Sequence, residues 1–288
     1  MKERLKTSTE IASAAKIVGE ERAIEYIAKA GFDAWDFSMW TMCGYDWKNG
    51  RPCFTEHPLA GAEYAGFAKK LRAVGESNGI VCNQSHAPYP SSCKEIRSYF
   101  KRAIECTAIA GGQICVIHPD NDKSPEENAE MYLELLPFAK EHGVKIATEN
   151  MWNWDSKADR ATFAACATPE SFLAHLDAVN DDFFVACLDI GHAEMEGLGT
   201  CAADMIYALK DKLSALHLHD NDRRHDLHQL PFTMAIDFGK VVTALKDVGY
   251  KGYMTLEADR YLTAYSSEDV FDGIKKMADV AKRLAQKA

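Results

Sequence analysis

Eight short β-rich segments recur along the 288-residue chain, and an amphipathic helical pattern separates each segment from the next. Strand, helix and strand in strict succession predict parallel strands joined by right-handed crossover helices. Eight such units in a chain of this length predict one (β/α)8 TIM barrel that spans residues 1–288 as a single domain. An open doubly wound sheet is the alternative, but no Gly-x-Gly-x-x-Gly follows the first segment. The predicted strands cover residues 5–11, 34–39, 80–86, 113–118, 144–149, 183–189, 214–220 and 252–258.

Helix boundaries agree with this division. Ser-Pro-Glu-Glu at 124–127 and Thr-Pro-Glu-Ser at 168–171 each place a capping hydroxyl before a proline at the first helical position. Apolar residues at three- and four-residue steps predict helices over 95–110 and over 270–284. Helices are expected to end where glycine precedes a strand, at 78–79, 111–112, 142–143 and 248–249.

Charge and cysteine content exclude several classes of protein. The formal net charge of −10 implies an acidic surface, which would repel nucleic acid backbones and anionic membranes. No run of about eighteen apolar residues is present to span a bilayer. Nine cysteines without a Cys-x-x-Cys pair indicate buried thiols in a reducing compartment. We therefore expect a cytoplasmic protein that binds a small neutral or cationic molecule, and a homo-oligomer is left open.

Polar side chains stand at the C-terminal ends of the last six predicted strands, where the active sites of TIM barrels collect. These residues are His86, His118, Glu149, Asp189, His217 and Glu257. Successive side chains in a strand point to opposite faces, and the positions two before the last four polar residues are all small, from Ala147 to Thr255. The last four polar groups should therefore point into the mouth of the barrel.

Three carboxylates and one imidazole would be costly to bury together unless a cation neutralised them. We therefore predict one divalent metal ion, Mn, Mg, Co or Zn, because oxygen-rich coordination with one nitrogen suits all of these. Its ligands would be Glu149, Asp189, His217 and Glu257.

The segment 216–230 holds four of the ten histidines. His217 and His219 share a parity, so both can face the mouth, with His217 deeper. His219 and His225 are expected to be solvated or to lie beside the metal ligands. Asp226 and His228 form an Asp-x-His pair, which either binds metal or orients the loop, and the sequence leaves both open.

Three further features belong to the same mouth. In Asp-Ile-Gly-His at 189–192, a tight glycine turn would direct His192 at the substrate. Arg223 would bind a substrate oxygen, unless it forms a surface pair with Arg224. Tryptophans in the loops after the second and fifth strands either floor a sugar site or pack in the core. They are Trp35, Trp40, Trp47, Trp152 and Trp154.

Five motifs carry a resemblance over nearly the whole chain: Glu-Asn-Met at 149–151, Asp-Ile-Gly-His at 189–192, His-Leu-His-Asp-Asn-Asp at 217–222, Asp-Leu-His at 226–228 and Leu-Glu at 256–257. With them the chain resembles the xylose isomerase-like TIM barrels, which include sugar (phosphate) isomerases and epimerases and the zinc endonucleases that act at abasic DNA. Many relatives have a Pro-Gly-Glu-Gly turn after Asp-x-His, whereas this chain has Leu-Pro-Phe-Thr-Met-Ala-Ile-Asp-Phe at 230–238. Strand two often ends in Glu in relatives, and here it offers Asp36.

The ketose 3-epimerase branch implies one metal on the four predicted ligands, with His192 and Arg223 contacting the substrate. On this interpretation His86, His118, Asp226 and His228 also bind substrate. The endonuclease branch implies a trinuclear zinc cluster, whose additional ligands would fall on His86, His118, His192, Asp226 and His228. The net charge of −10 favours the sugar enzymes.

The resemblance implies a metal-dependent isomerase or epimerase of a sugar or sugar phosphate that forms an enediolate, with Glu149 and Glu257 as base and acid. The same enediolate can expel a β-hydroxyl, so a dehydratase of a polyol or keto acid is the first alternative. A trinuclear-zinc phosphoesterase and a non-catalytic sugar-binding barrel are the other two.

Overall fold

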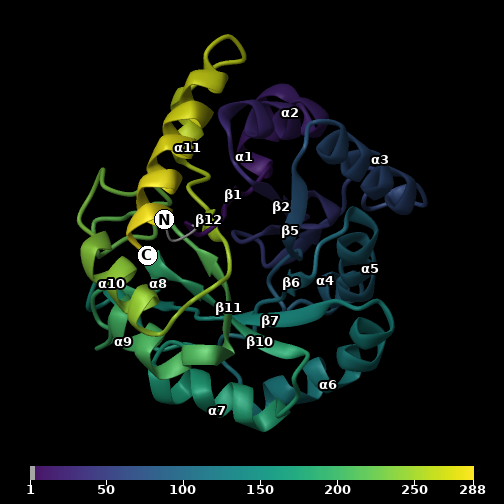
Figure 1. The fold of residues 1–288 in the computed structure, drawn as a ribbon. Coiled ribbons are helices and arrows are strands. Elements are labelled where there is room, and N and C mark those ends of the chain that lie inside the picture. The colour runs from purple at the N-terminus through teal and green to yellow at the C-terminus, as the bar shows by residue number, and fades with distance from the viewer. Residues whose placement is uncertain (1–3) are drawn as a thin grey trace.

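The computed structural model describes residues 4–288, in which eight parallel strands form the wall of a barrel (Figure 1). Each lies within one residue of a predicted strand or inside it. The strands are β1 (Thr7–Thr9), β2 (Ala34–Ser38), β5 (Val81–His86), β6 (Ile114–Val116), β7 (Lys145–Glu149), β10 (Phe184–Asp189), β11 (Leu213–His217) and β12 (Met254–Leu256).

The strand pairing closes the barrel. Six strands form one sheet in the order β11-β10-β7-β6-β5-β2, and β1 pairs with β12. Single parallel bridges, Glu10 to Asp36 and Leu218 to Leu256, join the two sheets on both sides. The predicted TIM barrel is therefore confirmed, and the open sheet is excluded. The pair β1 and β12 joins segments from opposite ends of the chain.

Helices surround the strands as an outer ring (Figure 1). They are α1 (Ala12–Val18), α2 (Glu20–Ala30), α3 (Tyr64–Ser77), α4 (Lys94–Arg97), α5 (Phe100–Ala110), α6 (Pro125–Glu141), α7 (Pro169–Val179), α8 (Ile190–Ala193), α9 (Ala202–Leu209), α10 (Phe238–Asp247) and α11 (Val270–Lys287). Short 3-10 turns cover Trp40–Met42, Lys210–Lys212 and Tyr261–Ala264. Among residues 4–288, no helix is long and apolar enough to cross a membrane.

The predicted helix starts are confirmed, and one predicted helix is wrong. Ser124 and Glu127 form a complete capping box on α6, and the Thr168 hydroxyl accepts a hydrogen bond from the Ser171 amide on α7. The helix expected over 95–110 is instead α4 and α5, which are separated at Ser98 and Tyr99. The Ser98 hydroxyl donates to the Glu95 carbonyl at 2.6 Å, a local bond that competes with continuation of the helix.

Side-chain parity divides the interior as predicted. Bulky residues such as Ile146, Leu188 and Leu216 belong to the large core between strands and helices. Small residues, among them Ala147 and Cys187, form a separate cluster inside the barrel. This alternation places the side chains at the ends of the same strands inside the barrel mouth.

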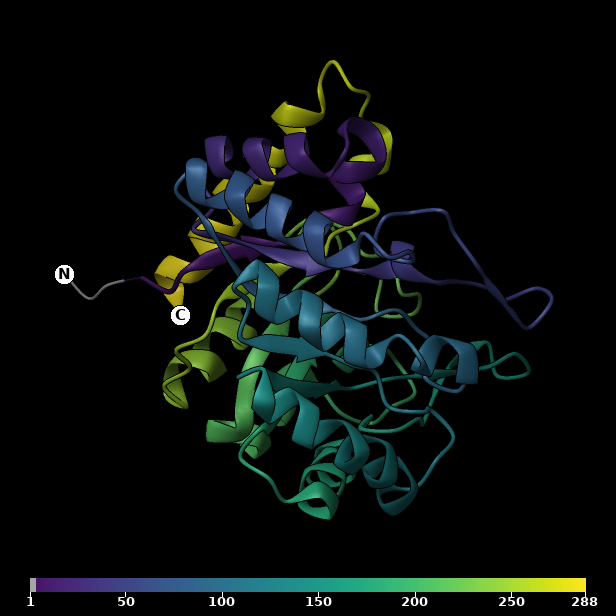
Figure 2. The same cartoon turned by 90° about the vertical axis from the view of Figure 1, so that its right-hand side faces the viewer.

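Two antiparallel hairpins were not anticipated. The pairs are β3 (Gly44–Asp46) with β4 (Arg51–Cys53), and β8 (Asn153–Asp155) with β9 (Arg160–Thr162). Each follows a barrel strand, and both extend beyond the end of the barrel opposite the chain termini (Figure 2). The two hairpins form part of the wall of the barrel mouth.

Candidate active site

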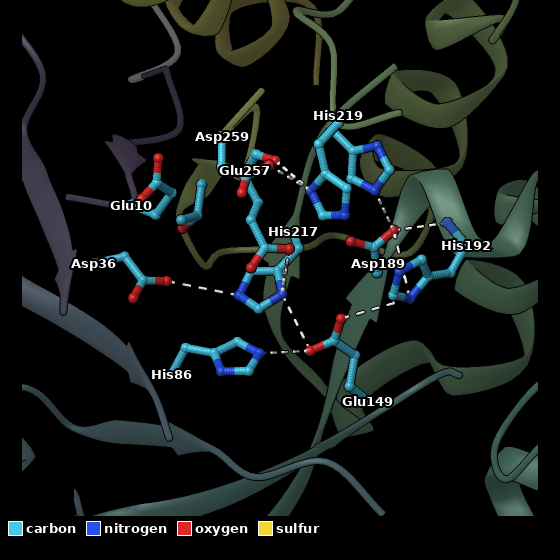
Figure 3. Close-up of polar contacts among 12 residues, drawn as sticks. Glu10, Asp36, His86, Glu149, Asp189, His192, His217, His219, Glu257 and Asp259 are labelled. Carbon is cyan, nitrogen blue, oxygen red and sulfur yellow. Dashed lines mark hydrogen bonds and ion pairs between the residues drawn. The ribbon is translucent and has the colours of Figure 1, made fainter. Parts of the chain in front are cut away.

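Four polar side chains converge at the floor of the barrel mouth (Figure 3). Each of Glu149, Asp189, His217 and Glu257 offers one ligand atom, and these atoms all lie within 4.8 Å of one another. His217 Nδ1 lies 3.2 Å from Glu149 Oε2 and 3.4 Å from Glu257 Oε2. The structure thus brings together the four residues predicted to bind metal.

The donor set fits a divalent cation. Three of its buried atoms, Glu149 Oε2, Asp189 Oδ2 and His217 Nδ1, have no hydrogen-bond partner among the described residues. A buried carboxylate or imidazole atom without a partner is destabilising, and a cation placed among these atoms would satisfy all three at once. Three carboxylates and one imidazole could therefore hold Mn, Mg, Co or Zn.

Asn150 holds two of the site residues in place. Its side chain donates to the Asp189 carbonyl at 2.9 Å and accepts from the Asp189 amide at 2.8 Å. The Asn150 carbonyl accepts a hydrogen bond from His192 Nδ1 at 2.9 Å. Asp189 Oδ1 in turn accepts from the His192 amide at 2.7 Å, which leaves Oδ2 free to face the other ligands. The motif Glu-Asn-Met signalled this residue, but its role depends on β10 lying beside β7.

Asp36 lies behind His217 and away from the cavity. Its Oδ2 atom is 3.6 Å from His217 Nε2 and accepts a hydrogen bond from Gln84 Nε2 at 2.9 Å. At 3.6 Å the two atoms are too far apart for a hydrogen bond, so Asp36 acts on His217 through its charge. The residue at the end of strand two that differs from many relatives therefore lies next to His217.

Histidines beside the four ligands form two further groups. His192, His219, Asp226 and His228 make one, and His86, His118 and Glu149 make the other. The Nδ1 atoms of His192 and His228 lie 2.9 and 2.8 Å from main-chain carbonyls, to which they donate. This bond directs both Nε2 atoms toward Asp226 Oδ2, at 3.4 and 3.1 Å. Both groups could therefore bind a cation or a substrate hydroxyl.

His219 occupies the second of its two expected positions. It is fully buried, its Nε2 atom is 3.1 Å from Asp189 Oδ1, and its ring stacks on His228 with centroids 3.9 Å apart. His225 is half exposed and pairs with Asp222 at 2.9 Å, in agreement with the solvated position expected for it.

Gly191 makes room for His219, so the predicted glycine turn is wrong. Gly191 lies inside the short helix α8 with an ordinary helical backbone. A Cβ atom at this position would overlap the His219 imidazole. The glycine in Asp-Ile-Gly-His is therefore needed for close packing, and His192 is positioned by Asn150 instead.

Asp220 is a structural residue that the sequence analysis missed. Its carboxylate accepts hydrogen bonds from the amides of Thr233, Met234 and Ile236 at 3.1, 2.9 and 3.0 Å. These bonds close the loop that carries Asp226 and His228. This loop lacks the Pro-Gly-Glu-Gly turn, and the buried Asp220 carboxylate instead ties its two ends together. The sequence does not show this role, because it depends on the path of the loop back to Asp220.

A cavity of about 530 Å³ lies above the floor. Glu149 and Glu257 face it, whereas Asp189 and His217 are not among its lining residues. All the predicted substrate-binding residues except Arg223 line it: His86, His118, His192, Asp226 and His228. Four tryptophans also line it, namely Trp40, Trp47, Trp152 and Trp154. Trp35 is instead fully buried in β2, so its predicted loop position is wrong.

Arg223 lies outside the cavity. Its Nη2 atom is 3.9 Å from Glu194 Oε2, and about half of its side chain is exposed. Arg260 lines the cavity in its place. Substrate binding by Arg223 therefore stays a prediction without a contact to support it. Arg260 follows Leu-Glu-Ala-Asp at 256–259, a position that the strand-end argument could have flagged.

The two glutamates have opposite electrostatic environments. Burial alone would raise the pKa of Glu149, but the neighbouring His217 and His118 hold it well below the ordinary value. Burial raises the pKa of Glu257 well above its ordinary value, and the negative charge of Glu149 raises it further. The two carboxyl groups therefore differ in proton affinity, with Glu149 the weaker proton acceptor of the pair.

A third glutamate, Glu10, is buried on the far side of Asp36 from the cavity. Glu10 follows β1, accepts a hydrogen bond from the Ser13 amide at 3.0 Å and is also bonded to the Ser13 hydroxyl. Burial raises the pKa of Glu10 to about 7, and the charges of Asp259 and Asp36 add to the effect.

Comparisons with known proteins identify the family and the fold of the chain. A family model described as xylose isomerase-like TIM barrel matches residues 24–285. An uncharacterised protein of Methanocaldococcus jannaschii is 26% identical over 269 residues, which cover 86% of this chain and 82% of that protein. Two solved structures share the fold. A D-tagatose 3-epimerase-like protein has TM-score 0.69 and 21% identity, covering 97% of this chain and 99% of the other. A 3-keto-D-glucoside 4-epimerase from E. coli has TM-score 0.65 and 14% identity, covering 96% and 100%.

We predict that Gly191→Ala destabilises the protein by about 1–3 kcal/mol, because the new methyl group must displace the His219 ring. Urea unfolding measures the change. Gly66→Ala is the control, since Gly66 is exposed inside α3 with open space around it. That variant should be stabilised by about 0.5–1 kcal/mol. Equal effects at the two positions would contradict the packing role of Gly191.

Glu10 should make stability depend on pH. Its folded-state pKa of about 7 exceeds the ordinary value of 4.5, so the protonated form favours folding and stability falls as pH rises from about 4.5 through 7. Glu10→Gln removes this loss. Its unfolding free energy relative to wild type should rise by on the order of 3 kcal/mol between pH 4 and pH 8. Exposed Glu170→Gln should give a flat difference. A flat difference for Glu10→Gln would show that its pKa is not raised.

Proposed function

The chain belongs to the xylose isomerase-like TIM barrel family, and on that premise we propose that it is a divalent-metal-dependent isomerase or epimerase of a sugar. One observation carries the proposal: four side chains able to bind a metal ion converge on the floor of a cavity, and two of them are glutamates that face it. The names of the similar structures, a D-tagatose 3-epimerase-like protein and a 3-keto-D-glucoside 4-epimerase, support the same class of reaction.

The bound cation would supply Lewis-acid stabilisation of negative charge on the substrate's carbonyl oxygen. We assign its binding to Glu149, Asp189, His217 and Glu257. Asn150 holds Asp189 in place through two hydrogen bonds, and the Asp36 carboxylate faces His217 Nε2 at 3.6 Å. The histidines above the floor would bind the sugar hydroxyls through their Nε2 atoms.

The two glutamates perform the proton transfers. Glu149 is the last residue of β7, and Glu257 comes directly after β12. The strands β10 and β11 lie between them in the barrel. Their carboxylates therefore reach the sugar from different sides. One carboxylate removes the proton from the carbon next to the carbonyl, and the C–H electron pair moves into the enediolate. The other carboxyl group returns a proton to the opposite face, and configuration at that carbon is inverted. Glu149 is assigned as the base and Glu257 as the acid, because the pKa of Glu149 is lowered and that of Glu257 is raised.

Replacing either glutamate should nearly abolish turnover. We expect Glu149→Gln and Glu257→Gln to lower the rate of solvent-deuterium incorporation into a ketose panel by about 10²–10⁴-fold, the usual contribution of a positioned proton-transfer group. Glu170→Gln, at an exposed site on α7, is the control and should keep the wild-type rate. Wild-type exchange in either cavity variant would refute the two-carboxylate mechanism. Loss of water with a new chromophore would indicate a dehydratase instead.

Metal removal tests the cofactor. A protein stripped by a chelator should lose deuterium exchange and regain it when Mn²⁺, Mg²⁺, Co²⁺ or Zn²⁺ is added back. The same addition should raise the unfolding temperature, because an ion that binds only the folded state stabilises it. Elemental analysis of the purified protein counts the ions. Undiminished exchange in the stripped protein would contradict metal dependence, and three zinc ions with cleavage of abasic DNA would favour a phosphoesterase.

A further inference from the structure

A second hollow opens beside the main cavity. It has a volume of about 240 Å³ and is lined by Trp152, Trp154, His225, Asp226 and Arg260. All of these except His225 also line the main cavity, so the two spaces adjoin each other. The main cavity alone, at about 530 Å³, lies within the range of roughly 300–1,000 Å³ that encloses drug-sized ligands. A single hexose is smaller than such ligands and leaves the outer hollow unfilled.

Aromatic rings line the path from the floor to the outer hollow. The ring of Trp152 meets His192 edge-on at 6.4 Å and Trp154 edge-on at 6.3 Å. Trp154 stacks on His225 with centroids 5.7 Å apart. Both tryptophans pack against a small apolar cluster under the β8–β9 hairpin, which includes Met195. Rings held in this way offer apolar faces that can cover the C–H face of a sugar.

The charge of the cavity disfavours a phosphorylated ligand. Its lining carboxylates are Asp120, Asp122, Glu149, Asp226, Glu257 and Asp259. Among the described residues that line it, Arg260 is the one Lys or Arg side chain. Phosphate sites use clustered Arg and Lys or the amides of a helix N-terminus, and nearby carboxylates repel the phosphate. After a divalent cation is counted, the balance of fixed charge is still negative.

Resting on the function proposed above, we propose that the substrate is an uncharged glycoside or disaccharide. Its reacting sugar lies over Glu149 and Glu257, and its second sugar or aglycone lies in the outer hollow against Trp152, Trp154 and His225. Arg260, at the junction of the two spaces, donates hydrogen bonds to hydroxyls of the bound sugar.

Deuterium exchange on a set of defined probes tests this proposal. The holoenzyme is given D-fructose, D-fructose 6-phosphate, and three disaccharides in which a second sugar is attached to different hydroxyls of fructose: lactulose, palatinose and trehalulose. We expect at least one disaccharide to exchange with kcat/KM about tenfold above D-fructose, the gain expected from one added aromatic contact. D-fructose 6-phosphate should be the poorest probe. Preference for D-fructose 6-phosphate, or for D-fructose over all three disaccharides, would overturn the proposal.

Two variants localise the effect. His225→Ala changes a side chain that lines only the outer hollow, and it should lower the ratio of disaccharide to D-fructose kcat/KM about tenfold. Phe163→Ala is the matched control. Phe163 is exposed, adjoins the same hairpin and lines neither space, so its replacement should leave the ratio unchanged. An unchanged ratio in His225→Ala, or an equal loss in Phe163→Ala, would refute the outer subsite.

Binding separates failure of this proposal from failure of the function. If no probe exchanges deuterium, the isomerase or epimerase function falls. Quenching of tryptophan fluorescence then decides the subsite, because Trp152 and Trp154 line it. A disaccharide that binds about tenfold more tightly than D-fructose, with the difference lost in His225→Ala, would support the two-part site. Equal affinities would overturn it.

Discussion

The burial of charge at the barrel mouth is the constraint on which the rest of the structure depends. Three carboxylates and an imidazole meet within 4.8 Å of one another, and buried atoms on three of these side chains have no hydrogen-bond partner within residues 4–288. Burying such groups costs several kcal/mol unless they are neutralised. A single divalent cation would neutralise the carboxylates and satisfy the unpaired atoms at once. Both the proposed Lewis acid and the proposed proton-transfer pair therefore arise from one electrostatic requirement.

Much of the surrounding structure serves to hold these groups in place. Asn150 bonds both the amide and the carbonyl of Asp189, Asp36 faces His217 from behind, and Gly191 lets His219 approach. Asp220 organises the loop that brings Asp226 and His228 to the cavity. The hydrogen bonds of Asn150 and Asp220 restrain these segments, and the proposed cation would satisfy the atoms of the four ligands that are still unpaired, because an unpaired polar atom is costly in a dry interior. Rigidity at the floor leaves specificity to the hairpins and loops above it.

The walls of the mouth explain why one barrel scaffold can serve different sugars. The floor ligands are positioned by strand ends, whose geometry is common to all TIM barrels. The tryptophans and Arg260 come from segments that follow the strands, and such segments can change in length and direction without disturbing the sheet. In this chain they build a wide, acidic and aromatic space, which suits a neutral carbohydrate larger than one ring. Substrate choice and chemistry are thus carried by different parts of the fold.

The sequence by itself determined the strands, their order and the residues at their ends. His86, Glu149, Asp189 and His217 each end a strand as predicted, because period-two alternation and glycine-terminated helices are local signals. Only the tertiary structure decided which polar residues support them. The partners of Asp220 lie 13–16 residues away along the chain. Asn150, directly after β7, meets Asp189 at the end of β10 because these two strands pair. It also placed Arg260 on the cavity and Arg223 against Glu194. Such contacts depend on the path of the loops, which no local pattern of residues encodes.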